Sequence, residues 1–119
     1  MEKDNKIAGK EYTAAYTWGD ACKAWLLQQS ENVIIKEEMM PPDTSESLHL
    51  HEGMEQFFYI LEGQATFILD GKTVHIKSRE GLSIRAGLPH KIINNTKEPL
   101  TFIVISAPGS AGDRIEIGD

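Results

Sequence analysis

Short β-rich segments recur along this chain about every 8–12 residues, with turn signals between them. The segments typical of strands are 32–40, 48–51, 56–61, 64–69, 72–77, 82–85, 90–94 and 100–106. Asp70-Gly71 separates two of these segments and is a strong signal for a two-residue hairpin turn. This rhythm predicts an all-β fold, either a sandwich or a barrel of antiparallel strands.

The length of 119 residues fits one compact domain and is too short for two ordinary ones. We expect a barrel over residues 31–107, an N-terminal arm over residues 1–30 and a C-terminal tail over residues 108–119. Within the arm, the segment from Ala21 to Leu27 is compatible with a short helix and with an extended arm. We expect the arm to pack either on the barrel or on a dimer partner.

Charge and composition argue against several classes of function. The chain carries 12 Lys and Arg against 18 Asp and Glu, and it has no basic stripe that would neutralise phosphates. Residues 1–6 are charged, and no apolar run approaches the length of a bilayer span. Cys22 is the only cysteine, so an internal disulfide is impossible. We therefore expect a cytoplasmic protein that binds neither nucleic acid nor membranes.

Three histidines form a candidate metal site. His49 and His51 lie two residues apart in a predicted strand, and His90 begins a later one. In extended chain, residues i and i+2 point to one face with Cα atoms about 6.5–7 Å apart. Each neutral imidazole offers one nitrogen lone pair, and two such rings can converge on one ion at about 2.0–2.1 Å per bond. The pattern predicts a site for a divalent transition metal.

A fourth ligand is expected from the strand that follows. Gln56 shares a strand face with Phe58 and Ile60, so its amide oxygen joins the histidines if that face points toward them. Glu55 points the opposite way in a regular strand, but a β-bulge would reverse the choice and make Glu55 the ligand.

The same alternation suggests which side chains contact a bound substrate. Phe58 and Ile60 are expected as walls of the pocket because they share the face of Gln56. Ile92 and Asn94 are expected to join them from the strand of His90. For Asn94, a role in a turn or cap is equally compatible with the sequence.

The order and spacing of these residues resemble the two motifs of the cupin superfamily. His49-Leu50-His51, followed after four residues by Gln56 and after six more by Gly63, resembles the first motif. Gly87-Leu88-Pro89-His90, followed after three residues by Asn94, resembles the second. The resemblance extends over residues 33–105. It implies a small single-domain cupin, a double-stranded β-helix or jelly-roll barrel, here with a short N-terminal arm.

The resemblance implies that four side chains bind Zn, Ni, Mn, Co or Fe: His49, His51, Gln56 and His90. Cupins commonly have glutamate where this chain has Gln56, and a neutral amide leaves the ion with its full charge as a stronger Lewis acid. Arg79-Glu80 and Arg85 stand where the second motif usually has a Gly-Asp pair and a proline. Arg85 either faces solvent or offers a planar donor to a carboxylate or phosphate.

The resemblance further implies a small-molecule ligand or substrate and a homodimer. One interpretation is a metalloenzyme with dioxygenase-like or isomerase-like chemistry on a small oxygenated substrate, such as a sugar derivative, diketone or phenolic acid. A second is a non-catalytic cupin that binds or senses a small ligand, and a third is a cupin whose metal only stabilises the barrel. The sequence alone identifies no obvious general base. Glu55 is the carboxylate nearest to the expected ligands.

Overall fold

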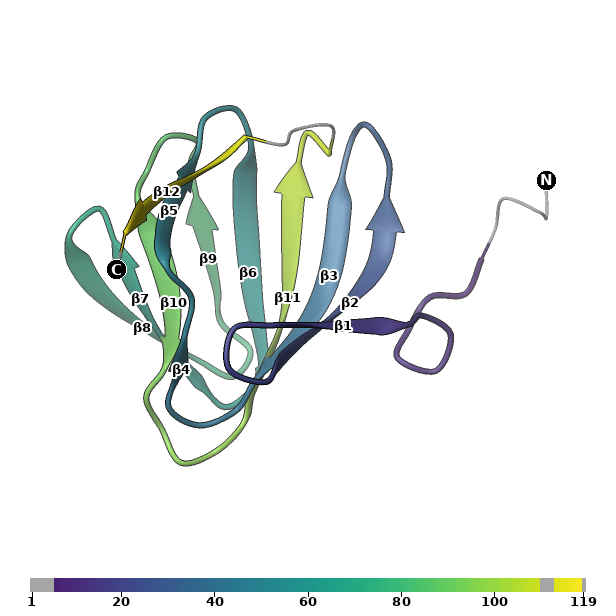
Figure 1. Cartoon of the computed structure of the whole chain (residues 1–119), viewed down its shortest axis with the longest axis horizontal. Helices are drawn as coiled ribbons and strands as arrows, with labels where there is room; N and C mark the ends of the chain where they lie inside the picture. Colours follow the sequence, from purple (N-terminus) through teal and green to yellow (C-terminus); the bar gives the residue numbers. More distant parts are fainter. Residues whose placement is uncertain (1–5, 110–112, 119) are drawn as a thin grey trace.

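The structure is a computed structural model that describes residues 6–109 and 113–118, and within those ranges it consists of strands, turns and loops (Figure 1). The strands that follow the predicted segments are β3 (Ile34–Met40), β5 (Leu48–His51), β6 (Glu55–Glu62), β7 (Gln64–Leu69), β8 (Lys72–Lys77), β9 (Gly81–Ile84), β10 (His90–Asn94) and β11 (Leu100–Ala107). A two-residue strand, β4 (Thr44–Ser45), precedes β5. The expectation of an all-β chain is confirmed over these residues.

Two turns show why particular residues are needed between the strands. Asp70 and Gly71 join β7 to β8 with φ values of 49° and 81°, the double positive φ of a type I′ hairpin turn. Gly63 joins β6 to β7 with a φ of 90°, and a Cβ atom there would lie 2.6 Å from the carbonyl oxygen of Pro99. Only glycine fits this second turn without displacement of the backbone.

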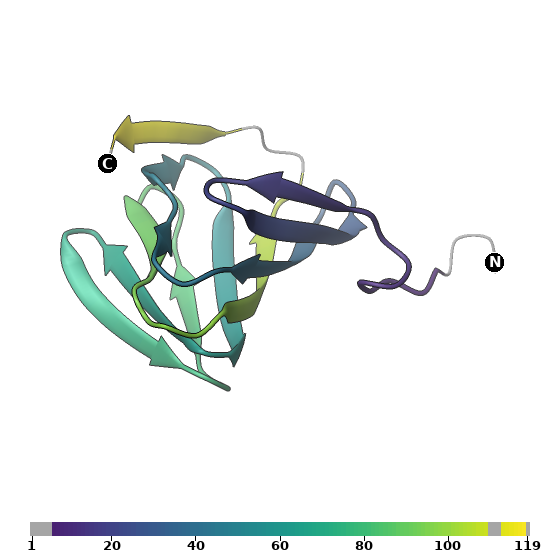
Figure 2. The same ribbon diagram turned by 60° about the horizontal axis from the view of Figure 1, so that its bottom comes forward.

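The strands form two antiparallel sheets that face each other (Figures 1 and 2). One sheet has the order β1-β2-β3-β11-β6-β9, and the other has the order β12-β5-β10-β7-β8, with β4 paired to β10. Neighbours in each sheet are mostly distant in sequence, as expected for a jelly-roll barrel. This topology brings β5 and β10, which carry the three histidines, side by side.

The core fills the space between the sheets. Three phenylalanines dominate it: the ring centroid of Phe58 lies 5.1 Å from that of Phe67 and 5.7 Å from that of Phe102. Ile60 and Ile92 are buried beside them. Along β6 and β10 the buried positions alternate with exposed or partly exposed ones, so both strands present one apolar face to the interior.

Both terminal segments add strands at the sheet edges. β1 (Ala15–Trp18) and β2 (Cys22–Gln29) form a hairpin, and β2 pairs with β3. The segment that was compatible with a short helix or an extended arm is therefore extended and forms a strand. Residues 108–119 were expected only as a tail, but β12 (Arg114–Gly118) pairs with β5. The side chains of Ile115 and Ile117 remain 41% and 46% exposed, so this edge strand buries neither of its isoleucines in the core. In the described ranges, no helix has the length and apolar character required to span a lipid bilayer.

Candidate metal centre

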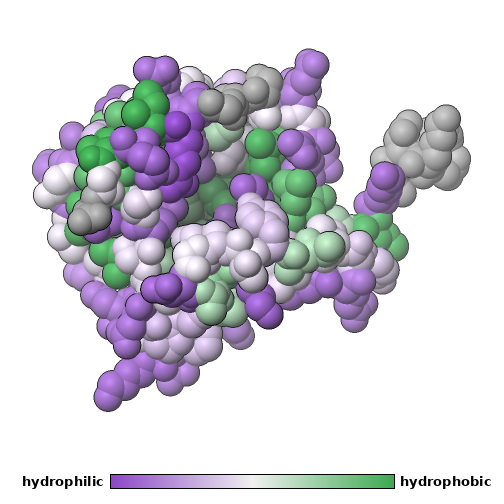
Figure 3. Space-filling view, in the orientation of Figure 1, coloured by the Kyte–Doolittle hydropathy of each residue, from purple (hydrophilic) through white to green (hydrophobic). Residues whose placement is uncertain are grey.

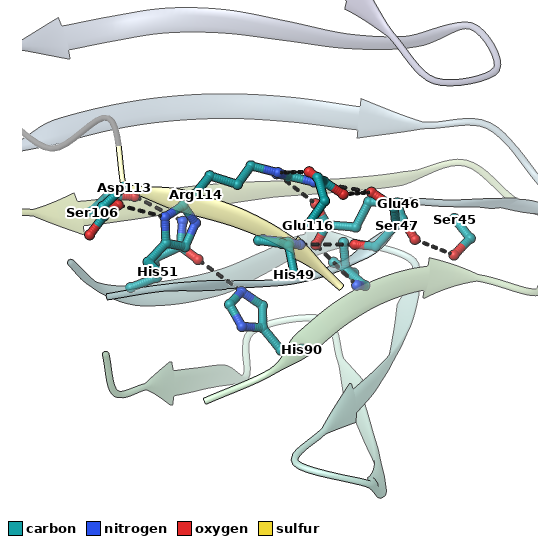
Figure 4. A network of polar contacts seen from close by, with 12 residues as sticks. Ser45, Glu46, Ser47, His49, His51, His90, Ser106, Asp113, Arg114 and Glu116 are labelled. Carbon is teal, nitrogen blue, oxygen red and sulfur yellow. Dashed lines mark hydrogen bonds and ion pairs between the residues drawn. The ribbon is translucent and has the colours of Figure 1, made fainter. Parts of the chain in front are cut away.

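Three histidine rings meet in the space between the two sheets. His49 and His51 come from β5, and His90 of β10 pairs directly with His49. The ring centroids lie 4.4 Å apart for His49 and His90, 5.2 Å for His49 and His51, and 6.0 Å for His51 and His90. His49 and His90 are almost completely buried, and His51 is partly buried. Figure 4 shows the three rings as one cluster beside β12.

One ligand nitrogen from each ring lies within 4.8 Å of the other two. Three ligands that are each about 2.1 Å from one ion lie about 3.4–3.6 Å from one another in tetrahedral or trigonal geometry. Side-chain rotations that close at most about 1.4 Å therefore bring all three nitrogens to a single ion.

The hydrogen bonds of the rings fix which nitrogen is free. In His49 and His90 the Nδ1–H donates to a backbone carbonyl at 2.9 Å, that of Ser47 and that of Leu88 respectively. In His51 the Nδ1–H donates to Oδ1 of Asp113 at 3.0 Å. Each ring thereby keeps its Nε2 lone pair free, which is the usual arrangement of a metal-ligating histidine with a second hydrogen-bonded partner.

Gln56 lies beside this cluster, and Glu55 does not. The amide Nε2 of Gln56 donates to Oγ of Ser106 at 3.0 Å, which turns its Oε1 toward Nε2 of His90 at 3.1 Å. Glu55 is exposed on the other face of β6, and the irregularity in the β6–β11 pairing lies between Thr101 and Phe102 rather than at Glu55.

The contact between Gln56 and His90 indicates that the donor set fits a cation. His90 Nδ1–H already donates to Leu88, so its Nε2 and the amide Oε1 present two lone pairs to each other. A second proton on the ring would relieve this repulsion, but burial lowers the pKa of His90 and so opposes it. Burial likewise lowers the pKa of His49 to about 4. A divalent transition metal bound by neutral imidazoles and an amide oxygen would accept both lone pairs and so remove their repulsion.

A cavity of about 210 Å³ lies next to the histidines. Of the side chains expected to contact a substrate, Phe58 and Ile92 line it. Ile60 is fully buried in the core and does not line it. Asn94 does not line it either: its Nδ2 donates to the carbonyls of Met40 and Glu98, both at 2.9 Å, which is a capping role. Figure 3 shows a hollow on the face of the molecule that Figure 1 presents, with apolar side chains in its depth and polar side chains around it.

Charged side chains that sequence reasoning missed form part of the cavity wall. Lys36 and Glu38 come from β3, Glu46 precedes β5, and Arg114 comes from β12. Burial raises the pKa of Glu38 to about 7, against the opposing effect of Lys36, and raises the pKa of Glu46 to about 8, against that of Arg114. Oε1 of Glu46 accepts the Ile92 N–H at 3.2 Å, whereas Glu38 accepts no hydrogen bond from the residues that the structure describes.

Asp113 is a further residue that the sequence did not indicate. Its Oδ1 accepts from His51, and its Oδ2 accepts the backbone N–H groups of Gly53 at 2.7 Å and Met54 at 2.9 Å. Desolvation acts to raise the pKa of Asp113, but these hydrogen bonds outweigh it and hold the pKa below its usual value. The carboxylate connects a histidine of the cluster to the loop after β5. Arg85, by contrast, is exposed.

Two relatives of known sequence resemble this chain. It is 31% identical over 83 residues to an uncharacterized protein of Methanocaldococcus jannaschii, a match covering 70% of this chain and 66% of that protein. It is 36% identical over 66 residues to an oxalate-binding protein of Thermotoga maritima, a match covering 56% of this chain and 54% of that protein. The matched regions thus span about half to two thirds of these relatives.

The structure is similar to the crystal structure described as a predicted oxalate decarboxylase from Thermotoga maritima, with a TM-score of 0.79. That match has 23% sequence identity and covers 86% of this chain and 98% of the other, which confirms the jelly-roll barrel. Residues 36–106 match the family model described as the cupin domain, and this is more than half of the chain. The protein therefore belongs to the cupin family.

Proposed function

We propose that this protein is a metal-dependent enzyme that acts on a small oxygenated acid. The observation that carries the proposal is the arrangement of His49, His51 and His90, with each Nδ1 hydrogen-bonded and the three ligand nitrogens within 4.8 Å of one another. Gln56 supplies the fourth donor through Oε1. Zn, Ni, Mn, Co and Fe all accept imidazole and amide ligands, so this donor set suits the whole group.

The choice of an acidic ligand rests on charge. The four proposed donors are neutral, so a bound divalent ion keeps its full charge and would polarise a carbonyl or carboxylate oxygen of the ligand. Lys36 and Arg114 add positive charge to the cavity wall. At about 210 Å³ the cavity is smaller than the roughly 300–1,000 Å³ of pockets for drug-sized ligands, and this size favours a small acid. The name of the oxalate-binding relative supports an acid of this kind.

The choice of an enzyme rests on Glu38. A group that transfers a proton works best when its pKa lies near the operating pH, and burial raises the pKa of Glu38 to about 7. Its carboxyl group lines the cavity and accepts no hydrogen bond from the described residues, so it is free to exchange a proton with a ligand. This favours isomerase-like proton transfer over dioxygenase-like chemistry.

The metal is tested first. Protein purified without chelator should contain a divalent metal by elemental analysis, and His90→Ala should lose it. Metal at less than a few per cent occupancy, with no uptake of added nickel, zinc, manganese or iron, would refute the metal site.

Catalysis is tested next with small 2-oxo and dicarboxylic acids. Turnover should disappear on chelation and return with metal, and Glu38→Gln should abolish turnover while the variant still binds metal and ligand. Metal-dependent binding of these acids without turnover would instead support a non-catalytic binding protein, the alternative that the name of the oxalate-binding relative favours.

The homodimer stays a prediction, as does the division into arm, barrel and tail. The hairpin region exposes Tyr12 and Tyr16, and Phe57 on β6 is 39% exposed and stacks on Tyr59. Aromatic side chains of this kind are enriched in protein interfaces. Sedimentation equilibrium of the purified chain tests the expectation directly.

A further inference from the structure

A second cavity, of about 530 Å³, adjoins the one beside the histidines. The two cavities share four wall residues, which are Lys36, Glu38, Glu46 and Arg114. The far wall of the second cavity consists mainly of Tyr16 and Trp18 from β1, together with the turn that follows them. We call it the hairpin cavity. An acid as small as oxalate would leave this whole space unused.

Lys36 stands at the boundary between the cavities with its charge available. Its Nζ lies 5.6 Å from the ring centroid of Tyr16, within the range of a cation–π contact. Among the residues that the structure describes, Lys36 has no carboxylate within ion-pair distance, although it attracts the nearby carboxyl group of Glu38, whereas Arg114 lies 3.8 Å from Glu46 and pairs with Glu116. A carboxylate of a ligand at this boundary would therefore find an ammonium group that no close ion pair holds.

The hairpin cavity also presents flat aromatic surface. Tyr16 is 44% exposed although its ring lies under Lys36, and Trp18 packs with one side against the core. Aromatic rings exposed in a concave wall favour planar apolar groups, which they contact by stacking or edge-to-face packing. The charged boundary and the aromatic wall thus suit two different ends of one ligand.

Building on the proposed metal-dependent function, we propose that the ligand is an acid with an aromatic tail. Its oxygenated head binds at the histidine cluster with its carboxylate near Lys36, and its ring lies in the hairpin cavity against Tyr16 and Trp18. The β1–β2 hairpin is then a specificity element that selects long acids over short ones.

The test compares two acids that share one head. Pyruvate and phenylpyruvate both carry a 2-oxo acid group, and only the second has an aromatic ring. Titration calorimetry with the nickel-loaded protein should give at least about tenfold tighter binding of phenylpyruvate, from the partial burial of one ring. Tyr16→Ala should weaken the binding of phenylpyruvate much more than that of pyruvate and so remove most of this advantage.

Two further variants separate the head from the tail. Lys36→Met should weaken the binding of both acids by a similar factor, because both place a carboxylate at the boundary. Tyr12→Ala is the matched control: Tyr12 is 63% exposed and is not part of the cavity wall, so neither affinity should change. Circular dichroism melts establish that each variant is folded.

Three outcomes would overturn the inference. The first is equal affinity for the two acids, and the second is an equal effect of Tyr16→Ala and Tyr12→Ala. The third is no binding of either acid by nickel-loaded protein. The first two leave the proposed function intact, whereas the third also counts against its acidic ligand, and failure to take up nickel at all would refute the metal site itself.

Discussion

Replacement of Asp113 by Asn should weaken metal binding without unfolding the protein. The carboxylate makes three hydrogen bonds: Oδ1 accepts from His51, and Oδ2 accepts from the backbone N–H groups of Gly53 and Met54. An asparagine has one acceptor oxygen in place of two. If that oxygen stays with the loop, the amide NH₂ faces the Nδ1–H of His51, and the ring loses the partner that holds Nε2 toward the cluster.

The size of the effect follows from this lost partner. Removal of a group that hydrogen-bonds a metal-ligating histidine typically costs about 10- to 100-fold in metal affinity, or roughly 1.4–2.7 kcal/mol. Asp113 is 15% exposed and His51 is 11% exposed in their side chains, so solvent replaces the bond poorly. We therefore expect an effect within this range rather than below it.

The assay is a competition titration of zinc or nickel against a chelator of known affinity. Glu55→Gln is the matched control, because it removes one negative charge next to Gln56 but on the exposed face of β6. Its metal affinity should stay within about twofold of the parent, since exposed charges are strongly screened. Equal affinities for Asp113→Asn and the parent protein would refute the positioning role of Asp113, and a large loss in Glu55→Gln would contradict the assignment of Gln56.

Three further predictions concern other parts of the molecule. The folded chain holds the proton of Glu46 up to about pH 8 and the unfolded chain releases it near pH 4.5, so stability in urea should fall as pH rises across this window, and less steeply in Glu46→Gln. Gln56→Glu should raise metal affinity about tenfold in the chelator titration, because a carboxylate adds Coulombic attraction to the ion, and should weaken the binding of oxalate. Gly63→Ala should destabilise the fold by about 1–3 kcal/mol, since its Cβ would clash with Pro99, whereas Gly71→Ala meets no atom within 4 Å and should cost only about 1 kcal/mol of positive-φ strain.

Most of the strands could be predicted because each one carries its own pattern. The alternation in residues 56–61 and the turn at Asp70-Gly71 depend on neighbours along the chain, so they can be recognised without knowledge of the fold. The histidine pair could be predicted for the same reason, because His49 and His51 share one strand face whatever lies opposite. Only the resemblance to the cupin motifs added His90 to that pair. The expected contacts of Ile60 and Asn94 with a substrate depended on the depth of the cavity, which alternation alone does not define.

The residues that were missed owe their position to the topology. Asp113 lies 62 residues from His51 in sequence, and only the pairing of β12 with β5 brings them together. Glu38 did leave a signal: together with Lys36 it shares a strand face with Ile34 and Met40, and Met40 is fully buried. Two charged side chains between two apolar ones on an inward face indicate a polar cavity, and this pattern could have identified the charged wall.

The opposed lone pairs of Gln56 and His90 make the amide group a spectroscopic reporter. When no cation lies between them, rotation of the amide by half a turn would direct its NH₂ toward the ring and give Oε1 to the hydroxyl of Ser106. Metal loading would reverse that rotation. The side-chain ¹⁵N–¹H resonances of Gln56 would then report how much of the site is occupied during a titration with diamagnetic zinc. The measurement requires no knowledge of the substrate.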